Sequence, residues 1–430
     1  MRQSEFSSSS VRAAIGAWAG FFTGPNAMVA SIASLFIMPW SRSFHLDRTQ
    51  VSGLLLISPA VVAVIVPLIG RAIDRWGVRR VLVPGALVFG ISQFAVAGAR
   101  TPFELVAAIL LVSFLAAVQS SVGYVKLISL WFGHSRGTVL SLCVALGAGL
   151  GSSLMPQFVR RLLEAYDWRI AYAGMGCVIL LIGLPLIVYC VREPARVLQA
   201  HAAHNELPGM DVRHAVRTRT FWVLFTLILL ASMTLIGTIV HAFPMLTERG
   251  FTAANATTAI SLIFAGGVCG QLLSGFIADR VESPRIVLPF LLFALVGLVI
   301  LHTTMLATTM LIGAAICGLG QGAEIALAGY LVSRLFGMRA FAGIYGLIFA
   351  ASNLGAGIGL MLMGAIHDHF GSYRVAGPVF AGALAVAVLL VLMLGKYRFP
   401  SRRALESLPV LKADPSSSIA VVVAESLHNE

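Results

Sequence analysis

Twelve long apolar segments, separated by short polar connections, run through this sequence of 430 residues. A helix needs about 20 mainly apolar residues to cross a bilayer, and the segments have approximately that length. Hydrophobic residues make up 58% of the chain and charged residues only 11%, whereas about a quarter of the residues in a soluble domain are charged. The sequence therefore predicts an all-α integral membrane protein. It excludes a soluble enzyme, a disordered chain and a disulfide-stapled secreted domain.

The segments form two sets of six around one long polar connection. The first six cover residues 13–39, 50–71, 81–99, 103–130, 138–162 and 170–191. The second six cover residues 220–244, 254–277, 285–304, 309–335, 341–365 and 375–396. This pattern predicts five regions along the chain: a head over 1–12, an N-terminal six-helix bundle over 13–191, a loop over 192–219, a C-terminal six-helix bundle over 220–396 and a tail over 397–430.

The basic residues predict the orientation of the chain. Most of the 30 Lys and Arg residues lie on the side of the head, the long loop and the tail, and basic residues concentrate on the cytoplasmic side of a membrane. Both ends of the chain are therefore expected in the cytoplasm. The net charge of +12 is explained by these connections beside anionic lipid headgroups, so no nucleic-acid partner is expected. The first apolar segment is too long for a cleavable signal peptide.

The residue types that hold metals and cofactors give no strong signal. The five cysteines fall inside apolar segments without metal-type spacing, which favours buried packing residues. The cluster His367-Asp368-His369 is more typical of a solvated loop end than of a metal site. No phosphate-binding GxxxxGK[ST] motif occurs in the sequence. We therefore expect no metal, no cofactor and no ATP site.

Three short motifs recur at almost the same separation along the chain. The separation is 205 residues for the first two pairs and 204 for the third: Gly70–Arg75 with Gly275–Arg280, Trp168–Arg169 with Tyr373–Arg374, and Phe132–Gly133 with Phe336–Gly337. The agreement indicates that each set of six segments is a copy of the other, entering the membrane from the same side. Two parallel six-helix repeats are typical of transporters that hold a substrate between the repeats near the middle of the membrane.

The loop after the second segment resembles the signature loop of the major facilitator superfamily, with the spacing Gly70-x-x-x-Asp74-Arg75-x-Gly77-x-Arg79-Arg80, and a weaker copy ends at Arg280. Further stretches resemble the bacterial branch of monocarboxylate porters and oxalate–formate antiporters: Thr49–Gly53, Tyr124-x-Lys126, Trp131–Phe132, Arg136–Gly137, Trp168–Tyr172, Phe221–Trp222, His241-x-x-Pro244, Gly322–Glu324, Ser333–Gly337 and Ile344–Gly346. The resemblance implies twelve transmembrane helices in two pseudo-symmetric bundles. It also implies proton-coupled transport of small organic acids across the bacterial inner membrane by a monomer.

Charged residues at the cytoplasmic ends of the second and eighth segments are expected to form a gate. A carboxylate there can bind the positive N-terminus of a neighbouring helix, and Arg side chains can pair across the interface between the bundles. In the superfamily that the chain resembles, this loop closes the cytoplasmic side of the outward-open state. The residues assigned to this gate are Asp74, Arg75, Arg79, Asp279 and Arg280. The alternative is that the Arg residues only determine topology.

Among all Asp, Glu, Lys and Arg residues, only Lys126 and Glu324 lie clearly inside an apolar segment. Glu324 precedes Phe336 by twelve residues, or about 18 Å of helix, which places it near the middle of the bilayer. A carboxyl group at that depth favours its protonated form and can exchange protons with a cavity. Glu324 is therefore the predicted proton-coupling residue, and a structural Glu between packed helices is the alternative. Many members of the branch carry a second acid two residues later, where this chain has Ala326.

Lys126 is the predicted cation for a carboxylate substrate, with hydrogen bonds from Gln119 and Tyr124 of the same segment. Lys126 lies only about 9 Å from the inner boundary, so its ammonium group reaching to water is the alternative. A pair between Lys126 and Glu324 across the cavity is a further option. Gln271 is a further predicted substrate-binding residue, at a position where the resemblance implies an Arg that holds the substrate carboxylate. With glutamine there, either Lys126 binds the anion, or the substrate is neutral, larger or less dependent on a carboxylate.

Three further polar residues are expected near the substrate. Asn26 follows Gly24-Pro25 in the first segment, and Asn353 lies in the eleventh. A proline inside a membrane segment tends to mark a bend beside a cavity, although a buried Asn can also only join helices. His241, near the outer end of the seventh segment, is expected to gate or to titrate, with a structural role as the alternative.

The main hypothesis from the sequence is a secondary transporter, not an enzyme, because the short loops leave no soluble catalytic domain. Its partners are a small organic anion, protons and the lipid bilayer. The alternatives are a drug or metabolite exporter of the same superfamily, an organic-anion exchanger, a membrane-embedded enzyme and a transporter-like sensor. An exporter usually carries a Gly-Pro motif in the fifth segment, which Gly151 and Pro156 match poorly.

Overall fold

The computed structural model describes residues 6–45, 48–194 and 208–399, and the described chain is helical almost throughout. Ten apolar helices, some continuing through a kink, are long enough to cross a membrane within these ranges. Of the two other predicted spans, the first is interrupted by short turns, and the second is α3 (Arg48–Trp76), with Arg71, Asp74 and Arg75 near its end. The predicted all-α membrane protein is confirmed.

Within the described residues, the first half of the chain contains nine further α-helices and four shorter turns. The α-helices are α1 (Ser8–Phe22), α2 (Ile37–Phe44), α4 (Val78–Ala97), α5 (Pro102–Val118), α6 (Ser121–Trp131), α7 (Arg136–Val144), α8 (Leu150–Ala165), α9 (Trp168–Val178) and α10 (Leu184–Cys190). The turns are η1 (Asn26–Ala30), η2 (Ala33–Phe36), η3 (Ala145–Gly149) and η4 (Ile179–Gly183).

The second half is more regular. A short helix, α12 (Val212–Ala215), precedes α13 (Arg219–Val240), α14 (Ala242–Glu248), α15 (Ala253–Ala278), α16 (Val287–Thr303), α17 (Ala307–Leu335), α18 (Phe341–Phe370) and α19 (Ala376–Leu392), with the short turns η5 (Pro284–Ile286) and η6 (Tyr373–Val375). Thr218 and Thr252 begin α13 and α15 by accepting hydrogen bonds from main-chain N–H groups of the first turn, as expected of N-cap residues.

The first and the fourth predicted spans are divided inside the membrane. In the first, α1 ends at Phe22, and a π-helical turn begins directly after Pro25, because proline cannot donate the main-chain hydrogen bond of a regular helix. The fourth, predicted to be continuous over residues 103–130, is divided into α5 and α6 by Gln119 and Ser120. Its counterpart in the second half, α17, continues for 29 residues without a break.

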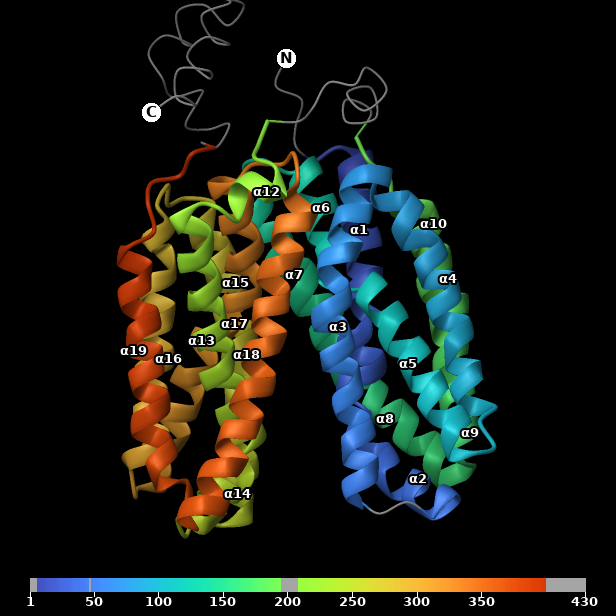
Figure 1. Cartoon of the computed structure of the whole chain (residues 1–430), viewed down its shortest axis with the longest axis vertical. Coiled ribbons are helices and arrows are strands. Elements are labelled where there is room, and N and C mark those ends of the chain that lie inside the picture. The colour runs from blue at the N-terminus through green and yellow to red at the C-terminus, as the bar shows by residue number, and fades with distance from the viewer. Residues whose placement is uncertain (1–5, 46–47, 195–207, 400–430) are drawn as a thin grey trace, which may run out of the picture.

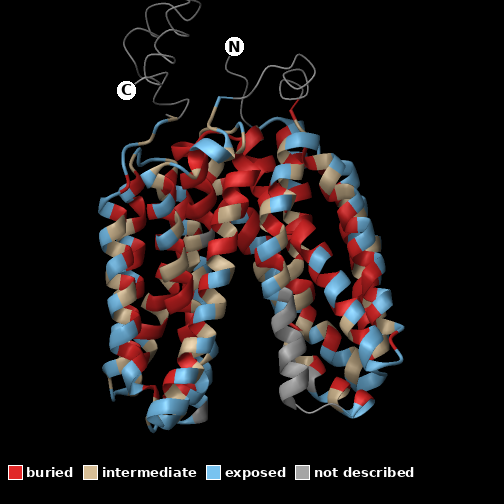
Figure 2. Ribbon diagram, in the orientation of Figure 1, coloured by how far each residue is buried: buried red, intermediate tan, exposed pale blue. Residues whose placement is uncertain are grey.

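The helices form two bundles that approach each other at one end of the molecule and separate toward the other (Figure 1). The beginning of α1 and the residues after α19 lie at the end where the bundles meet, which we call the closed end. Buried residues extend across both bundles there, whereas exposed residues follow the outer faces of the helices (Figure 2). The opposite end is called the open end.

Glycines allow the closest helix pair in the second bundle. A Cβ atom at Gly270 of α15 would overlap the main chain of Leu319, and one at Gly322 of α17 would overlap the main chain of Gly267. Small residues at such positions let membrane helices pack closely. Of the cysteines, which were predicted to be buried, Cys177 and Cys269 are exposed. The buried prediction was wrong for these two, because an apolar residue in a membrane segment can equally face lipid.

Candidate functional site

A cavity of about 660 Å³ lies between the two bundles. Its wall comes mainly from the first bundle, with contributions from α13 and α18 of the second. Apolar side chains dominate, among them Phe21, Val62, Val112 and Phe349. Every described residue in the wall is uncharged. This volume suits an organic molecule of several carbon atoms, and the wall offers it apolar surface with a few neutral polar groups.

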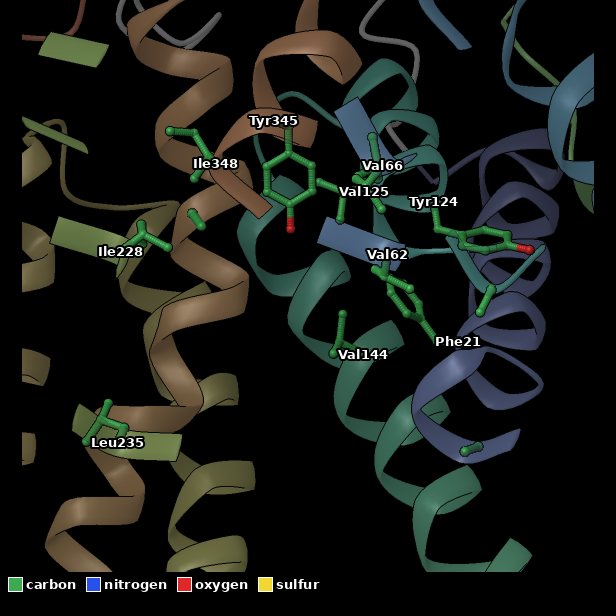
Figure 3. Close-up of a cluster of buried hydrophobic side chains, with 14 of the residues drawn as sticks. Phe21, Val62, Val66, Tyr124, Val125, Val144, Ile228, Leu235, Tyr345 and Ile348 are labelled. Carbon is green, nitrogen blue, oxygen red and sulfur yellow. The ribbon is translucent and has the colours of Figure 1, made fainter. Parts of the chain in front are cut away.

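The cavity is sealed on its closed side by apolar contacts between the bundles. In Figure 3 the ring of Tyr345 from α18 lies beside Val125 of α6 and Val66 of α3. A Cβ atom added to Gly346 of α18 would meet the main-chain oxygen of Val66 at 3.0 Å. Tyr345 and Val66 are buried. Because these contacts join α18 to helices of the other bundle, a solute in the cavity cannot reach the closed end without moving one bundle relative to the other.

Two predicted binding residues lie in the cavity wall, one from each half of the chain. Asn26 begins the π-helical turn η1 and is exposed, and Asn353 lies on α18 and is half-buried. The side-chain nitrogen of Asn353 donates one hydrogen bond to the main-chain oxygen of Phe349 at 2.8 Å, which leaves its amide oxygen and its second N–H for a solute. Both predictions remain predictions, and the geometry is compatible with them.

Gln119 and Tyr124 bind each other. The Tyr124 hydroxyl donates to the Gln119 amide oxygen at 2.5 Å, and the Gln119 amide nitrogen donates to the main-chain oxygen of Leu82 at 2.8 Å. Gln119 is part of the cavity wall, whereas Tyr124 is fully buried outside it. The amide group of Gln119 is therefore occupied in fixing the break between α5 and α6 against α4.

Lys126 lies in the closed end and outside the cavity wall. Its ammonium nitrogen is 2.7 Å from a carboxylate oxygen of Asp74, and its side chain is only 2% exposed. The side chain of Lys126 is thus neither in water nor in contact with Glu324, two arrangements that the sequence had left open. The structure brings Lys126 together with a predicted gate residue, which sequence reasoning missed because 52 residues separate the two.

Asp74 also contacts the second bundle. Its carboxylate accepts hydrogen bonds from the main-chain N–H groups of Ala342 at 3.1 Å and Gly343 at 2.7 Å. These groups belong to the first turn of α18, where main-chain donors lack partners within the helix and the helix dipole favours a negative charge. We call this contact the α3–α18 latch. It has the geometry that the sequence predicted for an acid at this position.

Asp279, at the end of α15, makes the equivalent contact with the first turn of α7. It accepts hydrogen bonds from the N–H groups of Gly137 at 2.7 Å and Thr138 at 2.8 Å, and from the Thr138 hydroxyl at 2.7 Å. Burial raises the pKa of Asp279 above its usual value, and the hydrogen bonds from Thr138 and Gly137 oppose this rise. We call this contact the α15–α7 latch.

The predicted gate arginines do not join the bundles through the hydrogen bonds observed. Arg79 donates to the main-chain oxygen of Val191 in its own bundle at 3.0 Å, and Arg280 donates to that of Phe276 in its own helix at 2.8 Å. No bond of the Arg75 side chain is seen among the described residues. Arg136, by contrast, crosses the interface and donates to the Ser333 hydroxyl at 2.5 Å. Sequence reasoning had treated Arg136 only as part of a family motif.

Glu324 lies on α17 behind the cavity wall. Its carboxyl group is hydrogen-bonded to Ser232 of α13 and, at 3.4 Å, to Ser352 of α18. A small pocket of about 10 Å³ is lined by Glu324, Ser352 and Phe349, and Phe349 also lines the large cavity. Phe349 is thus shared by the cavity and the small pocket, whereas Glu324 is not among the residues that line the cavity. Ser232 and Ser352 were not singled out from the sequence.

The last two predicted residues lie outside the cavity wall. Gln271 is buried on α15. His241 follows α13, and its ring nitrogen Nδ1 lies 3.2 Å from the Tyr373 hydroxyl. Burial lowers the pKa of His241, and the nearby His367 lowers it further. Among the described residues, no group of three or more His, Cys, Asp or Glu side chains is placed to hold a metal ion.

Comparisons with known proteins agree with this architecture. The model of the Major Facilitator Superfamily matches residues 17–308. Two similar curated proteins are the gallate transporter of Pseudomonas putida, 24% identical over 74% of this chain and 78% of that protein, and monocarboxylate transporter 13 of Rattus norvegicus, 23% identical over 82% of this chain and 81% of that protein.

A similar solved structure is that of FucP, described as a Major Facilitator Superfamily transporter in the outward conformation. It has a TM-score of 0.68 at 14% identity and covers 90% of this chain and 99% of that one. The human organic anion transporter MFSD10 has a TM-score of 0.63 at 13% identity, over 89% of this chain and 98% of that one. Likeness at this level of identity concerns the fold.

Proposed function

This chain belongs to the major facilitator superfamily, and we propose that it is a proton-coupled secondary transporter that carries small organic acids by alternating access. Membership of this family makes it a membrane transporter and not an enzyme. The proposal adds the substrate class, the coupling ion and the bacterial inner membrane, with both ends of the chain in the cytoplasm. The observation that carries it is the uncharged cavity between the bundles with the carboxyl group of Glu324 directly behind its wall.

Alternating access is supported by the two latches. Each joins a carboxylate at the end of one bundle to the first turn of a helix in the other bundle. Such contacts stabilise the conformation in which they form and are lost in the other, so they bias the equilibrium between the two. With the predicted orientation, the closed end faces the cytoplasm and the conformation is outward-open. Lys126 then serves as the counter-charge of Asp74 within the gate.

The substrate class is supported by the sequence pattern and by two relatives whose names refer to gallate and to monocarboxylates. Asn26, Asn353 and Gln119 place neutral polar groups around a mainly apolar cavity. A volume of about 660 Å³ admits acids with a bulky apolar body, such as an aromatic ring. The described lining of the cavity comes from a single chain, so the proposed transport needs only a monomer.

Glu324 is the proposed proton site. Its carboxyl group is half-buried within the membrane-spanning part of α17 and bonded to two hydroxyl groups, without a nearby cation among its hydrogen-bond partners. Uncompensated charge at such a depth is unfavourable. The group therefore favours the protonated state until rearrangement of Phe349 or the helices admits water. A pocket of about 10 Å³ has space for at most about one water molecule.

A drug or metabolite exporter of the same superfamily is the second candidate. The observation that favours it is the absence of charged side chains from the described wall of the cavity, because neutral apolar compounds need no counter-charge. An organic-anion exchanger would share the cavity but would not need the proton site.

Uptake by the purified full-length protein in proteoliposomes tests the proposal. Radiolabelled lactate, benzoate and gallate, and the amide of each, are offered with and without a pH gradient that is acidic outside. We expect accumulation of at least one acid when the gradient is present, and loss of accumulation when a protonophore removes it. Transport of neutral or cationic compounds alone would support the exporter. Uptake that requires an organic acid preloaded inside the proteoliposomes, and that does not change with the pH gradient, would support the exchanger.

A further inference from the structure

The break between α5 and α6 places the beginning of a helix inside the membrane. Residues Gln119 and Ser120 interrupt the two helices, and Ser120 has an extended main chain (φ −60°, ψ 166°). The bonds from Gln119 to Leu82 and Tyr124 hold the break in position. From Ser121, α6 continues for 11 residues toward the closed end. Its N-terminus therefore points toward the middle of the molecule.

This N-terminus forms part of the cavity wall. Gln119, Ser120 and Ser121 all line the cavity. The first N–H groups of a helix have no acceptor within the helix and carry its positive partial charge. Ser120 occupies the position of the N-cap, yet its side chain makes no capping hydrogen bond. The donors in the first turn of α6 are thus not capped by the residue that usually satisfies them.

The Ser120 hydroxyl is a second and independent sign of a ligand. Ser120 is 4% exposed, and its hydroxyl oxygen has no hydrogen-bond partner among the described residues. A buried hydroxyl without a partner is unfavourable, because the hydrogen bonds it makes to water in the unfolded chain are not replaced. Ser120 stands at the uncapped end of the helix, and it is one of the residues that line the same cavity. A bound group with acceptor atoms would satisfy both.

We propose that the N-terminus of α6 binds the carboxylate group of the substrate, with the Ser120 hydroxyl and the first N–H groups of α6 as donors. The inference rests on the proposed function and names its anion subsite. Helix N-termini bind carboxylates in this way without a charged side chain, and interrupted membrane helices can present such ends to anionic substrates. The apolar body of the acid then lies along Val112 and Phe349. This subsite removes the need for a cation in the wall.

Substitutions of Ser120 separate binding from folding. Ser120→Asn supplies an amide oxygen that caps the first turn, so it occupies the donors of the subsite and keeps or raises the melting temperature. Ser120→Ala removes the hydroxyl donor, and Ser120→Thr keeps it. Ser92→Ala is the matched control, because Ser92 is a buried serine of α4 outside the cavity wall whose hydroxyl already donates to Phe89 at 2.7 Å.

The experiment measures dissociation constants of benzoate and benzamide with the full-length protein in detergent, together with melting temperatures. A hydrogen bond to a charged group corresponds to about tenfold or more in affinity. We expect benzoate to bind about tenfold more weakly to Ser120→Asn and Ser120→Ala than to wild type. Its affinity for Ser120→Thr and Ser92→Ala should stay at the level of wild type. The affinity for benzamide should change much less in every variant.

Two results would overturn the subsite. One is an equal loss of benzoate and benzamide binding in Ser120→Asn, which would indicate altered cavity shape. The other is unchanged benzoate binding in both Ser120→Asn and Ser120→Ala. Failure of the proposed function is distinguishable from these, because wild-type protein would then bind neither benzoate nor any other acid of the uptake panel, and the subsite would fall with it.

Discussion

The fourth and the tenth predicted spans of the chain are equivalent by the internal repeat, yet they differ at mid-depth. The first is divided at Gln119 and Ser120, and the second, α17, continues through Glu324, which lies within one residue of the position of Gln119. Gln119 is bonded to Tyr124 and to a main-chain oxygen. Glu324 is bonded to two serines on the neighbouring helices.

This difference indicates that the two copies of a duplicated bundle can take separate roles in transport. The first half exposes uncapped helix donors in the cavity wall, which suit a substrate anion. The second half keeps a carboxyl group behind the wall, which suits a proton. Since the two groups lie at similar depth on equivalent helices, movement of one bundle relative to the other changes the surroundings of both. We infer that coupling depends on this arrangement.

At the closed end the halves are similar, and their difference is one of counter-charge. Asp74 and Asp279 each accept two main-chain hydrogen bonds from the first turn of a helix in the other bundle. Asp74 has in addition an ion pair with Lys126, whereas Asp279 has in addition the Thr138 hydroxyl and the nearby charge of Arg136. The two latches thus have the same geometry but are expected to differ in how strongly they depend on charge.

The largest effect is expected for Glu324→Gln, which makes the second half resemble Gln119 of the first. The glutamine keeps hydrogen-bonding capacity and cannot release a proton. Accumulation driven by a pH gradient should fall to background, while exchange of substrate between the two sides should remain measurable. Both rates are measured in the same proteoliposomes with the acid that wild type accumulates.

Glu104→Gln is the control for that substitution, because Glu104 is an exposed carboxylate near the beginning of α5 and a glutamine can retain its capping role. It should transport as wild type does. Accumulation by Glu324→Gln at the wild-type level would show that Glu324 is not needed for proton coupling. The structural difference between Gln119 and Glu324 would then have no role in transport.

The second effect concerns the α3–α18 latch. Asp74→Asn leaves the buried Lys126 without its counter-ion, and removing one partner of a buried pair costs about 3–5 kcal/mol. We expect Asp74→Asn to destabilise the closed end more than Asp279→Asn, which leaves no comparable buried lysine. Distances between spin labels on the two bundles at the closed end, together with melting temperatures, measure the change.

A second substitution tests whether Lys126 is the cause. Adding Lys126→Met to Asp74→Asn removes the unpaired charge and should restore part of the loss, so that the two substitutions are not additive. If the double variant were as unstable as the sum of the single variants, Lys126 and Asp74 would act independently. The ion pair would then not distinguish the two latches.

Sequence reasoning predicted the membrane fold, because apolar segments of membrane-spanning length leave few alternatives. The repeat also placed Asp74 and Asp279 at equivalent positions. The break at Gln119 and Ser120 was not predicted, because two polar residues inside an apolar segment do not by themselves end a helix. Their effect depends on Leu82, which belongs to another helix. The cation at Asp74 was missed for the same reason, since Lys126 reaches it only through the packing of α6 against α3.

The third effect concerns the α15–α7 latch and tests how much the Thr138 hydroxyl contributes to it. Thr138→Val removes the hydroxyl that donates to Asp279 at 2.7 Å but keeps the main-chain donor of residue 138. A hydrogen bond to a charged group contributes about 1.5–3 kcal/mol, so we expect a loss near the lower end of that range. Thr138→Ser should retain the bond. A loss in Thr138→Val as large as that in Asp74→Asn would contradict the proposed difference between the latches.

The smallest effect is expected at the open end, where the two halves again differ. The first half has Phe36, fully buried against Tyr172 with ring centroids 4.5 Å apart, and the second half has His241 beside Tyr373. Because burial lowers the pKa of His241 from its usual value of 6.5, the folded protein binds that proton more weakly than the unfolded chain does. Stability should therefore decrease as the pH falls below 6.5.

His241→Gln keeps a hydrogen-bonding side chain next to Tyr373 and removes the titrating group. The melting temperatures of variant and wild type, measured from pH 7.5 to pH 5, should diverge toward acid pH, with the variant losing less. The difference between the two curves isolates His241 from the other groups that titrate in this range. Parallel curves would mean that His241 remains equally protonated in the folded and unfolded states. The contact between His241 and Tyr373 would then contribute no more to the pH dependence of stability than the contact between Phe36 and Tyr172 in the first half.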